Sequence, residues 1–205
     1  LALSIFGVRR KGTGSIIFHG KESKEMSPVK AVKNGIGLAP EDRKQYGLAL
    51  KDSVALNIIG VSLKKYFRHW IVSYRKINQI ARKFIQSLRI VTPSPDRQCK
   101  FLSGGNQQKV VLAKWLSADT DLIIFDEPTR GIDVGAKLEI YDLMNKLANE
   151  GKAIIMISSE LPEVVGMSDR IYIMKEGTIV KGVKRNELTQ DQIGAIMLGV
   201  ENGAC

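Results

Sequence analysis

Two short apolar runs that alternate with helix-like segments restrict the fold of this 205-residue chain more than any other feature. Residues 122–125 and 153–157 are apolar throughout, which predicts strands buried on both faces. Helices are expected before and between them, over about 106–117 and 134–149, and Gly151 is placed to end the second helix. Alternation of helix and buried strand indicates an α/β layer with a parallel sheet.

Both ends of the chain predict smaller antiparallel elements. Apolar runs at 15–18 and 36–39 predict strands, and we expect this front section to form a small antiparallel sheet. Near the other end, residues 170–183 carry the turn pair Glu176-Gly177 between two apolar runs, which is typical of a hairpin. A last helix is expected over about 189–198.

The middle of the chain has a helical pattern. From about residue 52 to residue 88, charged stretches carry apolar residues such as Ile77, Ile80 and Phe84 at helical spacing. The sequence Thr-Pro-Ser-Pro at 92–95 then breaks the pattern. We therefore divide the chain, 1–205, into a front β-subdomain region at 1–51, a helical subdomain at 52–100 and an α/β core at 101–205.

The formal net charge is +10, and nucleic acid, an acidic membrane surface or nucleotide phosphates could each account for it. Part of the excess lies in one basic cluster, which consists of Lys64, Lys65, Arg68, Arg75, Lys76, Arg82 and Lys83. A solvated helical face is the favoured interpretation. A surface near anionic lipid headgroups is the second, and a nucleic-acid stripe is the third, because no nucleic-acid motif accompanies the cluster.

Composition excludes other classes. No apolar stretch approaches the ~20 residues needed to span a bilayer, and basic residues follow the apolar start Leu1–Gly7, so a secretory signal is not expected. That start resembles the end of a helix, from which we expect a fragment or a truncated reading frame. Cys99 and Cys205 match no metal or redox spacing, which favours a reducing, cytosolic setting with Cys99 as an inert thiol.

The segment Leu-Ser-Gly-Gly-Asn at 102–106 precedes a predicted helix and is a candidate anion site. Gly104 and Gly105 let the backbone approach a ligand closely, and Ser103 offers a hydroxyl donor. Unpaired N–H groups and the partial positive charge of a helix start favour a phosphate. The alternative is an ordinary N-cap with a flexible lead-in.

A second candidate feature is a pair of carboxylates, Asp126 and Glu127, at the end of the strand predicted at 122–125. Open α/β sheets place ligands at the carboxyl ends of their strands. Asp126 suits Mg²⁺, directly or through water, and Glu127 suits orienting or deprotonating an attacking water in phosphoryl transfer. Two solvated acids at a strand end are an equal alternative.

In this order, the two motifs strongly resemble those of the ATP-binding cassette (ABC) family. Ser103–Gly105 is similar to its signature loop, and the strand with the acid pair is similar to its Walker B segment. The Q-loop, D-loop and switch segment of the family correspond to Ala39-Pro40-Glu41, Gly131-Ile132-Asp133 and Ser158-Ser159-Glu160-Leu161. The resemblance spans essentially the whole chain. It implies an α/β, P-loop NTPase-like ABC cassette core with a small antiparallel β-subdomain and a helical subdomain, lacking the N-terminal P-loop portion.

A narrower set of segments resembles the C-terminal cassette of double-cassette ATPases that serve ribose, galactose and similar monosaccharide importers. The set consists of residues 40–44 (PEDRK), 105–109 (GNQQK), 126–135 (DEPTRGIDVG) and 158–164 (SSELPEV). Two cassettes share one polypeptide in that subfamily, so the chain is expected to be less than half of a natural subunit.

Three positions depart from the family pattern. The P-loop motif, G-x-x-x-x-G-K-[S/T], is absent from the 205 residues; the near miss at 7–12 has Thr13 in place of lysine, and a basic turn is the favoured interpretation there. By resemblance, the P-loop and an adenine-stacking aromatic residue are expected upstream of Leu1. Glu41 occupies the position of the Q-loop glutamine, and Ser159 that of the switch histidine. Since an acid disfavours a nearby triphosphate and serine carries no charge, a weakened catalytic site is expected, although Glu41 can also be an exposed loop acid.

The resemblance implies ATP and Mg²⁺ as cofactors. Asp126 is the expected metal ligand, and Glu127 and Ser159 are the expected catalytic residues. The residues expected at the nucleotide are Ser103, Gly104, Gly105, Asn106, Asp133 and Glu41.

By the same resemblance, the chain is an ATP-binding and ATP-hydrolysing fragment of a sugar importer, inactive alone. Its expected partners are a second ABC cassette, membrane permease subunits and, indirectly, a sugar-binding protein, at the cytoplasmic face of a bacterial cell membrane; no nucleic acid is expected. Two alternatives are a non-catalytic regulatory or nucleotide-sensing cassette and a soluble ABC ATPase that acts on nucleic acid.

Overall fold

The computed structural model describes residues 1–9, 13–67 and 73–199, and the chain divides into two compact units, 1–155 and 156–205. The first unit contains α1 (Ala2–Ile5), β1 (Ile16–Phe18), β2 (Lys21–Ser23), α2 (Pro28–Lys33), β3 (Ile36–Ala39), the π-helical turn η1 (Arg43–Gly47), α3 (Val54–Ile59), α4 (Leu63–Tyr66), α5 (Tyr74–Ser87), the 3₁₀ turn η2 (Cys99–Phe101), α6 (Gly104–Ser117), β4 (Leu122–Asp126), α7 (Val134–Asn149) and β5 (Ala153–Ile157), which crosses the boundary. The second contains α8 (Leu161–Met167), β6 (Arg170–Lys175), β7 (Thr178–Lys184) and α9 (Gln190–Leu198).

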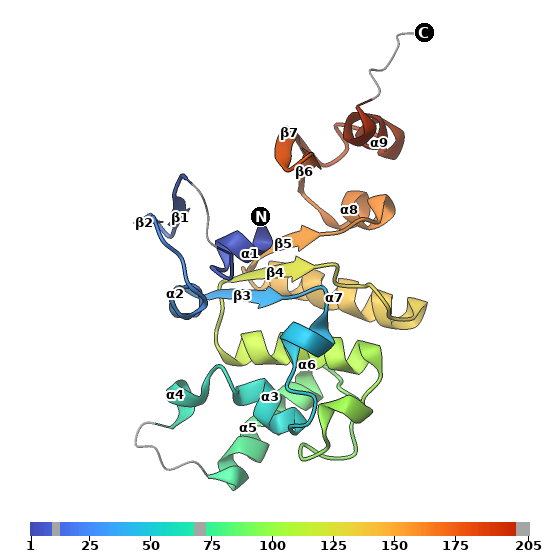
Figure 1. Cartoon of the computed structure of the whole chain (residues 1–205). Coiled ribbons are helices and arrows are strands. Elements are labelled where there is room, and N and C mark those ends of the chain that lie inside the picture. The colour runs from blue at the N-terminus through green and yellow to red at the C-terminus, as the bar shows by residue number, and fades with distance from the viewer. Residues whose placement is uncertain (10–12, 68–72, 200–205) are drawn as a thin grey trace. The chain divides into compact units, whose positions relative to one another are not determined.

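A three-stranded sheet in the order β3-β4-β5 forms the centre of the first unit (Figure 1). β3 and β4 are parallel, with Ile36 opposite Leu122 and Ala39 opposite Phe125. All four residues of β3 and the first four of β4 are buried. The expected parallel sheet is therefore confirmed for β3 and β4, whose carboxyl ends lie at the same edge. The burial expected for residues 153–157 is only partly met, because β5 is half-buried.

The expectation of one antiparallel sheet in the front section is wrong for β3. β1 and β2 do form an antiparallel hairpin, with Ile16 opposite Ser23, but β3 pairs with β4 in the parallel sheet. The physical reason is composition: residues 36–39 have no polar side chain to turn toward water, so the run suits a strand buried on both faces.

Helix α6 lies between the sheet and the helical part of the chain (Figure 1). It packs on β3 at one side and on α3 at the other, and α3 packs in turn on α5. Deep inside this layer the hydroxyl of Ser117 donates to the Ile58 carbonyl oxygen at 2.6 Å and lies 2.8 Å from the Ser62 hydroxyl. These bonds pair the buried hydroxyl groups of Ser117 and Ser62 and fix α6 to α3.

The basic cluster lies on α4 and α5, apart from Arg68, which falls outside the described residues. The six members that are described are exposed, while Ile77 and Ala81 on α5 face the core. Lys65 pairs with Asp119 at 3.3 Å. This placement agrees with the favoured interpretation of a solvated helical face. In the described ranges, the helices are all too short or too polar to cross a membrane.

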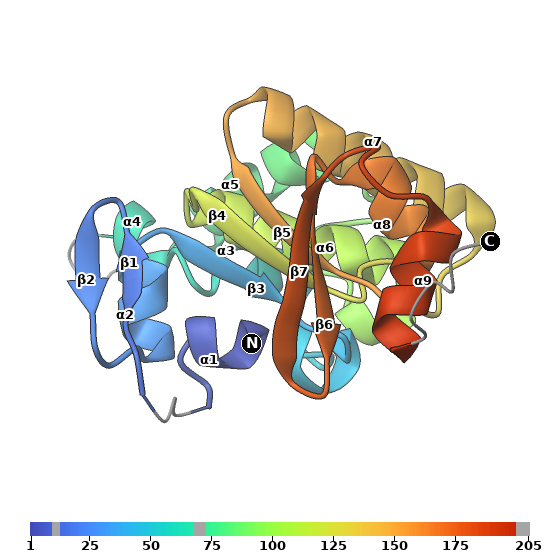
Figure 2. The ribbon, with the colours of Figure 1, turned by 90° about the horizontal axis from the view of Figure 1, so that it is seen from above.

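The second unit is built on the predicted hairpin. β6 and β7 pair antiparallel, with Arg170 opposite Lys184, around the turn at Glu176-Gly177. Helix α9 lies beside the hairpin (Figure 2), and its Ile193 packs in a small core with Ile171, Ile173 and Val183. Helix α8 was not predicted as a helix, because its seven residues include Pro162 and Gly166.

Candidate functional site

The candidate signature loop begins α6. Ser103 has extended backbone angles and is the N-cap of the helix, where its Oγ accepts a hydrogen bond from the Asn106 backbone N–H at 3.4 Å and from the Asn106 side-chain amide at 2.9 Å. Asn106 also accepts from the Val91 N–H at 2.7 Å, which ties the loop to the residues after α5. Ser103 is exposed, so its hydroxyl faces solvent at the start of a 14-residue helix.

Close backbone packing explains both glycines of this loop. A Cβ atom added to Gly104 would lie 2.6 Å from Nη2 of Arg43 and 3.2 Å from the Gly131 carbonyl oxygen. One added to Gly105 would lie 2.7 Å from Cβ of Ala136 on α7. The starts of α6 and α7 therefore touch, and two helix N-termini with their partial positive charges lie side by side.

The acid pair lies where the sequence predicts it, at the carboxyl end of β4. Asp126 is the last residue of the strand, and burial raises the pKa of its carboxyl group, with a further rise from the Glu127 carboxylate. Glu127 has a left-handed backbone, with φ at +51°. Such a conformation is unusual for glutamate and is concentrated at functional sites.

The residues at this edge fit a magnesium ion with few protein ligands. In the described residues, no group of three or more His, Cys, Asp or Glu side chains could enclose a metal. Mg²⁺ in phosphoryl-transfer sites instead uses one or two carboxylates and takes its other ligands from water and phosphates. A cation beside Asp126 would also offset the burial and the Glu127 charge that disfavour its ionised form.

Two predicted nucleotide residues already have structural partners. Asp133 is the N-cap of α7, and its Oδ1 accepts from the Ala136 N–H at 2.9 Å. Glu41 forms an ion pair with Arg130. The acid at the Q-loop position is therefore compensated by a cation from the loop after β4, which lessens its repulsion toward a phosphate.

Ser159 lies in the second unit, in the bend between β5 and α8, and is exposed. The adjacent Ser158 hydroxyl donates to the Glu163 carboxylate and accepts from the Glu160 N–H at 3.0 Å. This local network fixes the backbone on both sides of Ser159. A catalytic role for Ser159 stays a prediction.

Sequence reasoning missed the role of Arg43. Its guanidinium donates to the carbonyl oxygens of Arg130 at 3.1 Å and Gly131 at 3.4 Å. Burial lowers the pKa of Arg43, and the charge of Asp42 raises it. Arg43 belongs to the family-like segment at residues 40–44, but the sequence does not show what it contacts. The fold brings it to Arg130, which is 87 residues away in the sequence.

A second missed residue is Lys114, whose partly buried ammonium group donates to the Gly47 carbonyl oxygen at 2.6 Å and holds η1 on α6. Burial lowers the pKa of Lys114 from 10.5 to about 8. The folded chain therefore releases this proton near pH 8, while the unfolded chain keeps it to about pH 10.5. Because the unfolded state binds more protons at this group, the contribution of Lys114 to stability rises with pH above about 8.

We expect the free energy of unfolding to increase by about 1 kcal/mol between pH 8 and pH 9 through Lys114. Urea unfolding of the chain and of Lys114→Met at pH 7, 8 and 9 measures this, and Lys114→Met should lack the increase. Burial raises the pKa of Cys99 from 9.0 to about 12, so the unfolded thiol loses its proton first and stability falls above pH 9. Parallel pH curves for the two proteins below pH 9 would contradict the assignment.

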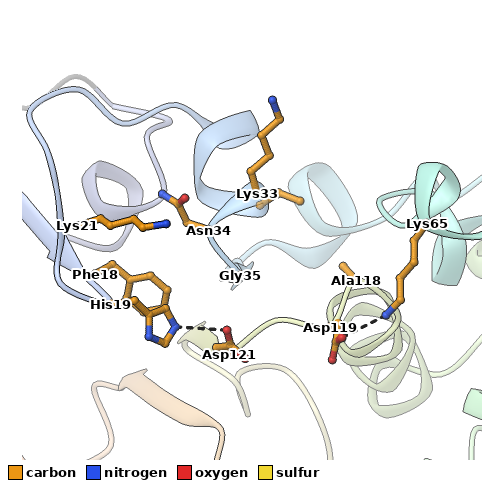
Figure 3. A pocket seen from close by; sticks show the side chains of 11 residues that line it. Phe18, His19, Lys21, Lys33, Asn34, Gly35, Lys65, Ala118, Asp119 and Asp121 are labelled. Atoms are coloured by element: carbon orange, nitrogen blue, oxygen red, sulfur yellow. Dashed lines mark hydrogen bonds and ion pairs between the residues drawn. The ribbon is translucent and has the colours of Figure 1, made fainter.

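A pocket lies at the opposite edge of the sheet. It has a volume of about 420 Å³ and is lined by residues that precede β3 and β4, among them Gly35 and Asp121. Figure 3 shows His19 pointing toward Asp121 at 3.3 Å and Lys65 toward Asp119 at 3.3 Å. Lys152 also lies 3.6 Å from Asp121, so lysines of the chain compensate both acidic groups. Ligands of parallel sheets bind at the other ends of the strands, so the candidate site is the edge with Asp126.

The signature-type loop at a helix start and the acid pair at the end of a buried parallel strand define the class of ATP-binding cassettes. A solved nucleotide-free ATP-binding cassette from an ABC transporter matches 97% of this chain and 78% of its own, with a TM-score of 0.75 and 20% identity. A dimeric cassette in a post-hydrolysis state with ADP and phosphate matches 91% of this chain and 80% of its own, with a TM-score of 0.74 and 18% identity. These likenesses show the fold.

The family model described as "ABC transporter" matches residues 1–130, and the chain belongs to this family. A ribose import ATP-binding protein of Clostridium tetani is 47% identical over 198 residues, which cover 94% of this chain and 38% of that protein. One of Rubrobacter xylanophilus is 44% identical over 194 residues, which cover 94% and 39%. The chain thus spans about two fifths of the length of these relatives.

Proposed function

We propose that this chain is the part of a carbohydrate import ATPase that closes over ATP held by a second cassette. The observation that carries the proposal is the Ser103 loop: an exposed hydroxyl at the start of a long helix, with glycines on its inner side and the start of α7 packed against it. This arrangement offers unpaired N–H groups and positive partial charge to an anion. The γ-phosphate of a nucleotide held by the partner is an anion of the right size.

In this role Asp126 and Glu127 face a nucleotide on this chain's own side. Asp126 would hold Mg²⁺, which supplies charge neutralisation at the phosphates when bound. Glu127 would orient the attacking water, because it directly follows the last residue of β4 at the carboxyl end of the sheet. The 205 residues contain no P-loop motif. We therefore expect the chain alone to bind ATP weakly and to hydrolyse almost none.

The assignment of sugar transport rests on the relatives, which are named for ribose import. On this basis the assembled protein would work at the cytoplasmic face of a membrane, with permease subunits that carry the sugar and a sugar-binding protein that delivers it. Closure of two cassettes over ATP, followed by hydrolysis, would switch the permease between its inward-open and outward-open states.

Association with a purified cassette that has its own P-loop tests the proposal. We expect ATP and Mg²⁺ to promote association, measured by analytical ultracentrifugation, and Ser103→Glu to weaken it about 10-fold, because a carboxylate would meet the phosphate. Ser87→Glu is the matched control, since Ser87 is also exposed but lies at the end of α5.

The outcomes separate the competing functions. Equal association of Ser103→Glu and the unchanged chain would overturn the closing role. Tight binding of labelled ATP by the chain alone, without a partner, would favour a nucleotide sensor. RNA or DNA binding that weakens steeply with salt would favour an ATPase that acts on nucleic acid.

A further inference from the structure

Three loops of the first unit meet at the guanidinium of Arg43. It comes from the start of η1, immediately after β3. Its Nη1 and Nη2 donate to consecutive carbonyl oxygens, of Arg130 and Gly131, in the loop that joins β4 to α7. The same Nη2 occupies the space that a side chain at Gly104 would need, 2.6 Å from an ideal Cβ there. One side chain therefore touches both the signature loop and the loop at residues 130–133.

The segment that carries Arg43 is itself fixed. Asp42 caps it and accepts from the N–H groups of Lys44 and Gln45, each at 3.0 Å. At its other end, Lys114 of α6 donates to the Gly47 carbonyl oxygen. Arg43 thus acts from a segment that cannot shift freely, and its rigid fork suits two neighbouring acceptors in a way that a single ammonium group does not.

The two loops that Arg43 touches both present capped helix starts. The loop at 130–133 ends at Asp133, the N-cap of α7, and the signature loop begins α6 with the N-cap Ser103. Their helices touch at Gly105 and Ala136. Because the two helix starts are in contact, a displacement of one loop would displace the other. A side chain that bonds to one loop and packs on the other would hold the distance between them constant.

We propose that Arg43 is the positioning residue that fixes the signature loop and the 130–133 loop as one surface for the second cassette. This inference rests on the proposed function, because the partner that it places on this surface is the second cassette with its bound nucleotide. Arg43 also explains why residue 104 is a glycine, in addition to the access that a glycine gives to a phosphate. The guanidinium fills the space that a side chain at residue 104 would occupy.

The first test uses the chain alone. We expect Arg43→Lys to speed amide hydrogen exchange at least 10-fold at both Asn106 and Ala136, whose N–H groups are held by the two N-caps. Lys44→Gln, a neighbouring exposed cation, should leave both unchanged. Gly104→Ala should also lower the thermal midpoint less in an Arg43→Ala background than in the unchanged chain, because the clashing group is gone.

The second test measures ATP-dependent association with a P-loop-bearing cassette. We expect Arg43→Lys to weaken association about 10-fold while the Kd of that cassette for ATP stays the same. If the unchanged chain associates and the Arg43 variants associate equally well, or if exchange is unaffected in both loops, the inference is overturned and the proposed function stands. If the unchanged chain fails to associate although Arg43→Lys speeds exchange, the proposed function is overturned together with the partner-facing role of Arg43.

Discussion

Replacement of Phe125 by alanine is expected to lower the free energy of unfolding by about 3–5 kcal/mol. Phe125 is fully buried in β4, the central strand of the parallel sheet, opposite Ala39 of β3. Its removal leaves a cavity that small neighbours cannot fill, because the adjoining residues belong to hydrogen-bonded strands. Since Asp126 follows directly, the loss also loosens the strand end that presents the acid pair.

Urea unfolding followed by circular dichroism measures this change. Phe101→Ala is the matched control, because Phe101 is 55% exposed and contacts the Arg97 guanidinium at 4.2 Å from its ring centroid. We expect the control to cost less than about 1 kcal/mol, as exposed cation–π contacts do. Similar losses for the two variants would contradict a close-packed core around β4.

A valine at Gly37 is expected to destabilise the chain by about 3 kcal/mol through overpacking. An ideal Cβ at Gly37 would lie 2.9 Å from Cγ and Cδ2 of Trp115, so the indole packs directly on the backbone of β3. Trp115 is 5% exposed, and Phe6 of the residues after α1 meets it edge-on with 5.6 Å between ring centroids. Because the indole is enclosed, it cannot swing away to make room.

The thermal midpoint and the near-ultraviolet dichroism of the tryptophan check this expectation. Gly166→Ala is the control, since no atom lies within 4 Å of the Cβ it would add. If the clash is with the indole, Trp115→Leu should partly restore a Gly37→Val chain. Additive losses in the double variant would show that another cause is at work.

Much of the fold is predictable from the sequence, because the period of the apolar residues and the length of each segment indicate the same type of element. The bounds of α7 and β5 match the expected ranges, and the hairpin of the second unit follows from its turn pair. The pairing direction of β3 could not be predicted, because a four-residue apolar run has no direction of its own. Helix α8 was missed because it has only seven residues, among them Pro162 and Gly166, so its apolar side chains are too few to show a helical period.

The candidate site was predictable only where its residues are local. Ser103 and the acid pair lie next to the elements that position them, whereas Asp133, which the sequence assigned only to the nucleotide, also caps α7. Arg43 and Lys114 act through carbonyl oxygens, which no residue pattern reveals. Their partners lie 87 and 67 residues away, so the contacts appear only when the sheet brings the loops together.

The left-handed backbone of Glu127 has a consequence for how such a chain evolves. Glycine or asparagine would adopt this conformation at a lower cost than glutamate, whose penalty is about 1 kcal/mol. Drift under selection for folding alone would therefore remove glutamate from this position. A lineage that keeps it retains a slightly less stable protein in exchange for an acid held at the end of β4, and loss of this glutamate in a descendant would mark relaxed selection on its chemistry.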